Sequence, residues 1–259
     1  MTLLAVDNVS KAFGGVHAIE ALSFGVRRGA VHSIIGPNGA GKTTLLNMLT
    51  GIYVPDAGRI RLDGRDLAGA ATHRFAAAGI ARTFQNLQIF FNMTALENVM
   101  TGRHLREHCS LLAALLRTPA LVRAESACRE MALRLLRRVG LGEYAQARAD
   151  AMPYGALKRL EIARALAAEP QLLLLDEPAA GLNPTEAHEI DTLIKRLAAD
   201  GTTVILVEHN MRLVMEVSDQ VLVLDHGRRL AEGTPAQVAR DARVVEAYLG
   251  VEAERPGHA

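Results

Sequence analysis

The sequence predicts an α/β fold built on a parallel sheet. Three observations predict it. Strand-like and helix-like segments alternate in the second half of the chain, a glycine-rich loop joins a strand-like run to a helical pattern near residue 40, and four consecutive leucines occupy 172–175. Because central strands of a parallel sheet are covered on both faces, they carry no polar side, which fits the leucine run.

The first third of the chain mixes predicted strands with short helices. Runs of β-branched and apolar residues between turn residues predict strands over 3–9, 21–26, 31–35 and 59–62. Leucine and methionine at helical spacing after residue 44 predict a helix that Gly51 ends. A second short helix is expected over 72–78.

From about residue 86 to 155 the pattern is helical, with almost no β-branched alternation, and predicts a helical insertion. Thr94 and Glu97 have the spacing of a capping box, and Thr118-Pro119 begins a helix expected to end before Gly140. The arginine-rich face of this helix is interpreted as a solvated surface rather than a nucleic-acid patch, because acidic residues interleave it. These are Glu107, Glu125, Glu130 and Glu143.

The α/β alternation returns after Gly155. Helices are predicted up to 168 and over 185–199 and 211–217, and strands over 171–175, 202–207 and 221–224. The polar residues 252–259 are expected to fray.

Composition excludes several classes of function. The 259 residues include 29 Lys+Arg and 28 Asp+Glu, a net charge of +1, which gives no electrostatic attraction to nucleic acid or anionic lipid. Cys109 and Cys128 lack metal-ligand spacing and suggest a reduced intracellular compartment. The start of the chain lacks the pattern of a signal peptide, and the uncharged stretch 109–116 is too short to span a bilayer.

The glycine-rich loop matches G-x-x-x-x-G-K-[ST], the phosphate-binding P-loop. Its glycines allow successive backbone N–H groups to face phosphate oxygens, Lys42 brings positive charge to the β- and γ-phosphates, and the Thr43 hydroxyl suits Mg²⁺. The predicted nucleotide-binding residues of the loop are Gly36, Asn38, Gly39, Ala40, Gly41, Lys42, Thr43 and Thr44.

Asp176 and Glu177 follow the leucine strand directly. Alone, this pair could be a solvated strand end. Combined with the glycine loop it predicts a hydrolytic site, because carboxyl ends of parallel strands share one crevice. Asp176 is then a candidate Mg²⁺ ligand, and Glu177 the carboxylate that deprotonates the attacking water.

At this point the chain resembles the nucleotide-binding subunits of ABC transporters along nearly its whole length. Gln85, in Phe84-Gln-Asn86, is similar to the family's Q-loop glutamine, which implies contact with Mg²⁺ and water. The segment 152–156 resembles the signature loop, with Tyr154 and Gly155 expected to cap the partner subunit's ATP. His209 occupies the position of the switch histidine that contacts the γ-phosphate. The alternative, non-functional interpretations are a surface amide for Gln85 and a surface histidine for His209.

Phe13 resembles the aromatic residue that stacks on adenine, although it is also compatible with packing into the small sheet. Three residues depart from the common family pattern: Pro153 replaces the signature serine, Ala156 replaces glutamine, and Asn183 stands where aspartate is common. The motifs are most similar to those of the branched-chain amino acid importers. We therefore interpret these three substitutions as typical of that subfamily.

The resemblance implies a P-loop NTPase (RecA-like) α/β core with a small antiparallel β subdomain and an α-helical insertion. It assigns 1–85 to the β subdomain and the first part of the core, 86–155 to the helical subdomain, 156–250 to the rest of the core and a C-terminal helix, and 251–259 to a polar tail. The expected cofactors are ATP and Mg²⁺.

The implied partners are a second ATPase subunit, identical or different, two membrane-spanning permease subunits and an external solute-binding protein, with no nucleic acid. The implied location is the cytoplasmic face of the inner membrane. Phe90, Phe91 and Met93 are expected either to line the permease docking groove or to form internal core. Alternatives are a lipopolysaccharide-export ATPase, a soluble ABC ATPase acting on nucleic acid or ribosomes, and a nucleotide-dependent binding module with little hydrolysis.

Overall fold

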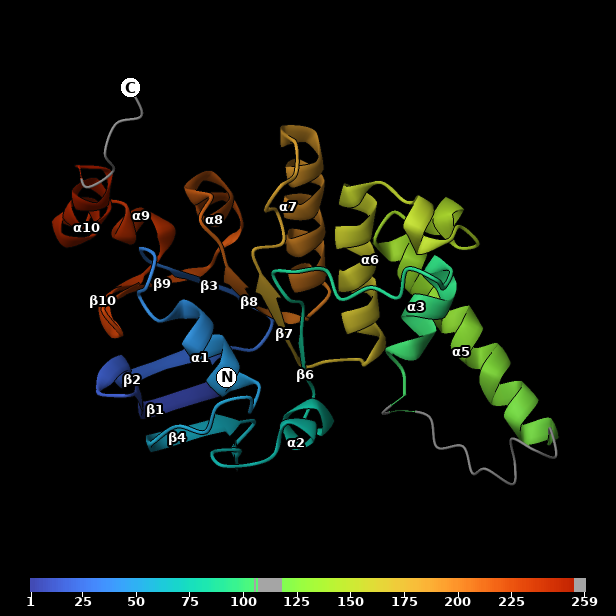
Figure 1. Cartoon of the computed structure of the whole chain (residues 1–259), viewed down its shortest axis with the longest axis horizontal. Coiled ribbons are helices and arrows are strands. Elements are labelled where there is room, and N and C mark those ends of the chain that lie inside the picture. Colours follow the sequence, from blue (N-terminus) through green and yellow to red (C-terminus); the bar gives the residue numbers. More distant parts are fainter. Residues whose placement is uncertain (105, 107–117, 254–259) are drawn as a thin grey trace.

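Two β-sheets organise the chain (Figure 1). The computed structural model describes residues 1–104, 106 and 118–253. Within these residues the larger sheet has the strand order β10-β9-β3-β8-β7-β6 and the smaller sheet the order β2-β1-β4-β5. The predicted stretch 109–116, with Cys109, and the acidic residue Glu107 lie outside the described residues. None of the helices in the described part has the length and apolar composition needed to cross a bilayer.

In the larger sheet every pair of neighbours is parallel except β9 and β10, which confirms the predicted parallel sheet. Its strands are β3 (Val31–Ile35), β6 (Ile80–Arg82), β7 (Leu172–Asp176), β8 (Thr203–Val207), β9 (Gln220–Asp225) and β10 (Arg228–Gly233). The four leucines of β7 are fully buried and alternate between the cores on the two faces of the sheet. This two-sided burial explains the uninterrupted leucine run.

The smaller sheet is antiparallel and lies beside the helix that follows the glycine loop. Its strands are β1 (Thr2–Phe13), β2 (Val16–Arg27), β4 (Ala57–Leu62) and β5 (Arg65–Asp66), and the helix is α1 (Lys42–Leu49). The apolar face of α1 packs in one core with β1, β2 and β4. Strands β1 and β2 are longer than predicted because their ends near the Gly14-Gly15 turn are mostly half-buried or exposed and lack a clear apolar alternation.

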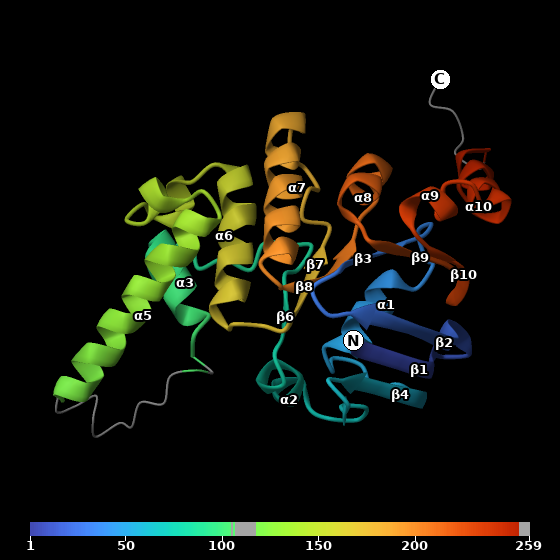
Figure 2. The same cartoon turned by 180° about the vertical axis from the view of Figure 1, so that it is seen from behind.

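The remaining helices cover the larger sheet and form a separate layer beside β6 and β7 (Figure 2). They are α2 (Thr72–Ala77), α3 (Ala95–Thr101), α5 (Pro119–Arg138), α6 (Tyr154–Ala167), α7 (Pro184–Ala199), α8 (Met211–Val217), α9 (Pro235–Val238) and α10 (Ala242–Ala253), with short 3-10 turns at Gly142–Tyr144 and Ala149–Ala151. The predicted Thr94 and Glu97 capping box is confirmed. Helix α10 runs through 251–253, residues that the sequence assigned to the polar tail.

Candidate nucleotide site

The glycine-rich loop leaves β3 at the carboxyl edge of the parallel sheet and enters α1. A Cβ atom at Gly36 would overlap the carbonyl oxygen of Leu224, and one at Gly41 would overlap that of Ala18. Gly41 also has φ +98°, in the left-handed region that favours glycine. These close approaches explain why the loop needs glycine at both ends. The first turn of α1 has unpaired N–H groups, as helix N-termini do, and such a terminus favours an anion.

Lys42 is buried at the start of α1, and its ammonium group faces the loop's own carbonyls. Its Nζ donates to the carbonyl oxygens of Gly36, at 2.7 Å, and Pro37, at 2.9 Å. Burial lowers the pKa of Lys42, while the carboxylates of Glu177 and Asp176 oppose that shift. The lysine is therefore a desolvated donor already positioned at the loop, where an anion is electrostatically favoured.

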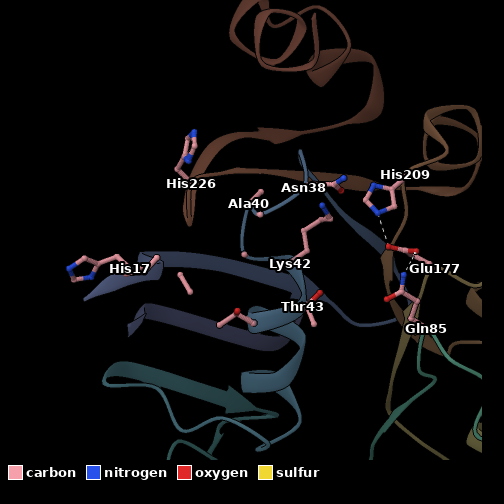
Figure 3. Close-up of a pocket in the computed structure, with 14 residues that line it drawn as sticks. His17, Asn38, Ala40, Lys42, Thr43, Gln85, Glu177, His209 and His226 are labelled. Atoms are coloured by element: carbon pink, nitrogen blue, oxygen red, sulfur yellow. Dashed lines mark hydrogen bonds and ion pairs between the residues drawn. The ribbon is translucent and has the colours of Figure 1, made fainter. Parts of the chain in front are cut away.

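A pocket of about 460 Å³ opens beside the loop, a volume typical of small-molecule sites (Figure 3). Its lining residues are Val16, His17, Ala18, Asn38, Gly39, Ala40, Gly41, Lys42, Thr43, Thr44, Gln85, Glu177, His209 and His226. Ten of the predicted site residues thus lie around one cavity. Val16, His17, Ala18 and His226 were missed, because they come from a strand end and a turn that carry no motif.

The three predicted catalytic residues meet at one end of this pocket. The Nε2 of Gln85 donates to Oε2 of Glu177 at 3.0 Å, and the Nε2 of His209 lies 2.6 Å from Oε1 of the same carboxylate (Figure 3). Glu177 has φ +49°, a strained conformation for a residue with a side chain, of the kind that clusters at functional sites. Gln85 and His209 are both exposed, so these contacts bring them beside Glu177 but leave their catalytic roles as predictions.

Asp176, the predicted metal ligand, makes an ion pair that the sequence did not reveal. Its Oδ2 lies 2.8 Å from a guanidinium nitrogen of Arg82, and the two side chains are 8% and 5% exposed. Arg82 is also fixed by the side chain of Asn47. Asp176 does not line the pocket, but it directly precedes Glu177, which does. Thr43, Gln85 and Asp176 all offer oxygen atoms, the donor type that Mg²⁺ prefers, so the donor chemistry fits this ion.

Glu208 is a further functional candidate that sequence reasoning missed. It is 4% exposed at the end of β8, and its carboxylate accepts hydrogen bonds from the backbone N–H groups of Ala179, His209 and Asn210. Burial raises the pKa of Glu208, and the three N–H groups oppose that shift. One buried carboxylate thereby joins the loop after Glu177 to the loop that carries His209.

Four predicted nucleotide contacts, Gly36, Phe13, Tyr154 and Gly155, do not line this pocket. Phe13 is 42% exposed, and its ring packs edge-on against that of Tyr53, with the centroids 5.1 Å apart. Tyr154 and Gly155 form the first turn of α6; the Tyr154 ring is 46% exposed and Gly155 is buried. Their contacts with nucleotide stay predictions.

Two of the three residues that depart from the family pattern have definable local roles. Pro153 is the N-cap of α6, and its missing N–H costs nothing there because the N-cap donor is unpaired in a helix. The side chain of Asn183 caps α7 in a capping box with Glu186.

Phe90 and Phe91 are each 46% exposed, so the internal-core interpretation is wrong for both.

Comparison with known proteins agrees with this geometry. The family model for ABC transporters matches residues 19–180, and a model described as a branched-chain amino acid ATP-binding cassette transporter matches 228–254. The chain is 45% identical to the high-affinity branched-chain amino acid transport ATP-binding protein BraF of Pseudomonas aeruginosa, over 96% of this chain and 98% of the relative. It is 43% identical, over the same shares, to LivG of Escherichia coli, which carries the same description.

Solved structures give the same result. A nucleotide-free ATP-binding cassette from an ABC transporter superposes with a TM-score of 0.83 and 34% identity, covering 96% of this chain and 99% of its own. A cassette in its ADP conformation superposes equally well, with 33% identity and the same coverage. These matches confirm the predicted P-loop α/β fold. The chain belongs to the ABC transporter family, as one of its ATPase cassettes of the branched-chain amino acid group.

Proposed function

We propose that this chain is the ATP-hydrolysing subunit of an importer for branched-chain or related amino acids. The observation that carries the proposal is the meeting of Gln85, Glu177 and His209 at the pocket that the glycine loop lines. The named activities of BraF and LivG support the choice of solute. They also favour this function over lipopolysaccharide export and over a soluble ATPase acting on nucleic acid or ribosomes.

ATP binds with its phosphates along the loop before Thr43. The N–H groups at the start of α1 donate to phosphate oxygens, and Lys42 exchanges its bonds to the Gly36 and Pro37 carbonyls for bonds to the β- and γ-phosphates. This exchange is favourable because hydrogen bonds to charged acceptors are stronger than those to neutral carbonyls.

Glu177 accepts a proton from the water that attacks the γ-phosphate, and Gln85 orients that water. His209 moves from Oε1 of Glu177 to the γ-phosphate, which frees this oxygen to act as the base. Thr43, Gln85 and Asp176 would hold Mg²⁺, which neutralises phosphate charge. Cleavage of the terminal bond leaves ADP and phosphate in the pocket.

A second ATPase subunit completes the site. We place Tyr154 and Gly155, at the N-terminus of the 14-residue helix α6, over the γ-phosphate bound by the partner, where the helix dipole favours an anion. Because these residues do not line the pocket of their own chain, only a head-to-tail pair brings a P-loop and a signature turn together. ATP binding then closes the pair, and hydrolysis opens it.

Two permease subunits receive this movement at the inner membrane's cytoplasmic face. Exposed Phe90 and Phe91, next to the half-buried Met93, offer an apolar docking surface shortly after Gln85 in the chain. An external solute-binding protein delivers the amino acid.

The experiment that tests the proposal is steady-state ATP turnover of the assembled transporter with Glu177→Gln. We expect turnover to fall by about 10²–10⁴ while ATP remains bound, because loss of a general base spares binding. Filter binding of labelled ATP provides the second readout. Unchanged turnover in this variant would reject Glu177 as the base.

A further inference from the structure

Helices α7 and α8 lie side by side on the larger sheet and bring three potential metal ligands together (Figures 1 and 2). His188 and Asp191 are three residues apart on α7 and so share one face of that helix, and Glu216 lies on the last turn of α8. One ligand atom from each residue lies within 4.8 Å of the other two. We propose that this cluster binds a divalent transition-metal ion, for which Zn²⁺ is the best-fitting candidate.

Asp191 supplies the independent support for a bound cation. The residue is 8% exposed, and its Oδ1 is buried without a hydrogen-bond partner. Leaving a carboxylate oxygen buried and unpaired is costly, and native structures rarely do so without a bound water or ion. Burial and the neighbouring Glu216 carboxylate also raise the pKa of Asp191. A metal ion would satisfy the oxygen and offset both effects.

The basic residues around the cluster do not provide a hydrogen-bond partner for Oδ1 of Asp191. Arg212 pairs through Nε with Oε1 of Glu216 at 3.0 Å, and its side chain is 85% exposed. Lys195 is exposed one turn further along α7. Exposed ion pairs of this kind contribute little to stability. A dication held by two carboxylates therefore displaces Arg212 at small cost.

The donors and the surrounding space select the class of ion. An imidazole with two carboxylates suits Zn²⁺ and its neighbours in the first transition row, whereas Mg²⁺ and Ca²⁺ take oxygen ligands. A groove of about 600 Å³ reaches His188 and Asp191 and is lined by residues of both helices and of the loops before them. This groove leaves room for an entering ion and for water as the fourth tetrahedral ligand.

The test is calorimetric titration of Zn²⁺ into the full-length chain, stripped with chelator and free of nucleotide. Three variants are compared with the unmodified chain: His188→Ala, Glu216→Gln, and His73→Ala as a control at an exposed histidine on α2. We expect a single Zn²⁺ site that His188→Ala weakens at least about 100-fold, beyond the 10–100-fold that losing a supporting partner costs. The His73→Ala control should bind normally, and Mg²⁺ should not compete.

Thermal unfolding gives a second readout, because an ion that binds only the folded chain raises its melting temperature. Zn²⁺ should raise it in the unmodified chain and in His73→Ala, reversibly by chelator, and not in His188→Ala. If His188→Ala does not fold, Glu216→Gln still tests whether this cluster binds Zn²⁺. Equal Zn²⁺ affinity in the unmodified chain and in both cluster variants, or no binding at all, would overturn the proposal.

Discussion

At the scale of single residues, the buried carboxylate of Glu208 connects the two loops of the proposed catalytic site. Its oxygens accept from Ala179 and His209, both at 3.0 Å, and from Asn210 at 3.4 Å. Glu177 and His209, which those loops carry, are themselves 2.6 Å apart. The geometry of the proposed base therefore depends on a residue that does not line the pocket.

Glu208→Gln should lower the free energy of unfolding by about 1–3 kcal/mol, because the amide NH₂ turns a donor toward a backbone N–H that then loses its partner. Turnover should fall more than the KM for ATP rises, since the loops shift while the phosphate loop stays intact. Urea unfolding and ATP titration of the rate measure both effects. The exposed Glu125→Gln is the matched control, and equal behaviour of the two variants would contradict this role.

The sequence predicted those site residues that sit in contiguous motifs. The phosphate loop and the Asp176-Glu177 pair are examples, because the residues of each motif are neighbours in the sequence. It did not predict Arg82 and Glu208, whose partners are distant in sequence: Arg82 pairs with Asp176 across 94 positions, and Glu208 reaches back 29 positions to Ala179. Their contacts arise from the order of neighbouring strands, which residue spacing alone does not reveal.

At the scale of elements, β3 carries a buried titratable group at the centre of the parallel sheet. His32 is 1% exposed, its ring lies 5.7 Å from that of Phe24, and its Nε2 has no partner. Burial, assisted by the charge of Arg27, lowers the pKa of His32 to about 4. The folded chain therefore holds this histidine neutral at pH values where the unfolded chain protonates it.

This difference makes the stability of the sheet depend on pH. The contribution of neutral His32 is complete above the unfolded pKa of about 6.5 and is lost as the pH falls toward 4, a change of about 3 kcal/mol. His32→Leu removes the titrating group. As the pH falls from about 6.5 to 4, the free energy of unfolding of this variant should therefore fall less than that of the unmodified chain. Denaturant unfolding at several pH values measures the difference, and parallel curves would show that His32 does not titrate on unfolding.

Element types were predictable where a periodic run was long and flanked by clear signals. Helix α8 has the predicted bounds, and α7 begins one residue earlier than predicted. Strand β6 was missed because Ile80–Arg82 is too short to show alternation. Strand β10 was missed because Ala231 is its one buried residue and most of the others are charged. Both strands exist because a neighbour in the sheet offers backbone hydrogen bonds.

At the scale of the whole molecule, the helical layer with α3, α5 and α6 lies away from the smaller sheet (Figures 1 and 2). The pocket is lined by the start of β2, by the glycine loop and by Gln85, which directly precedes the helical insertion in the chain. Movement at Gln85 can therefore reach the surface at Phe90 and Phe91 through a short segment of chain. In the proposed function, Tyr154 and Gly155 act on the nucleotide of another subunit, so this part of the site cannot be tested by the geometry of one chain.

Replacing Phe90 and Phe91 together by Ser should abolish most co-purification with the membrane subunits from detergent-solubilised membranes, because the apolar docking surface is lost. ATP binding by the isolated variant should be unchanged. Val245→Ser, at an exposed apolar position on α10, is the control. Normal recovery of the complex with the double variant would show that docking uses another surface.

Isothermal titration calorimetry of ATP with Mg²⁺, comparing the unmodified chain with Lys42→Ala, tests the central claim most directly. We expect one ATP per chain and binding about 10- to 100-fold weaker in the variant, the loss expected for a hydrogen bond to a charged group. Equal affinity for both chains, or no binding to either, would contradict the assignment of the glycine loop as the seat of the triphosphate.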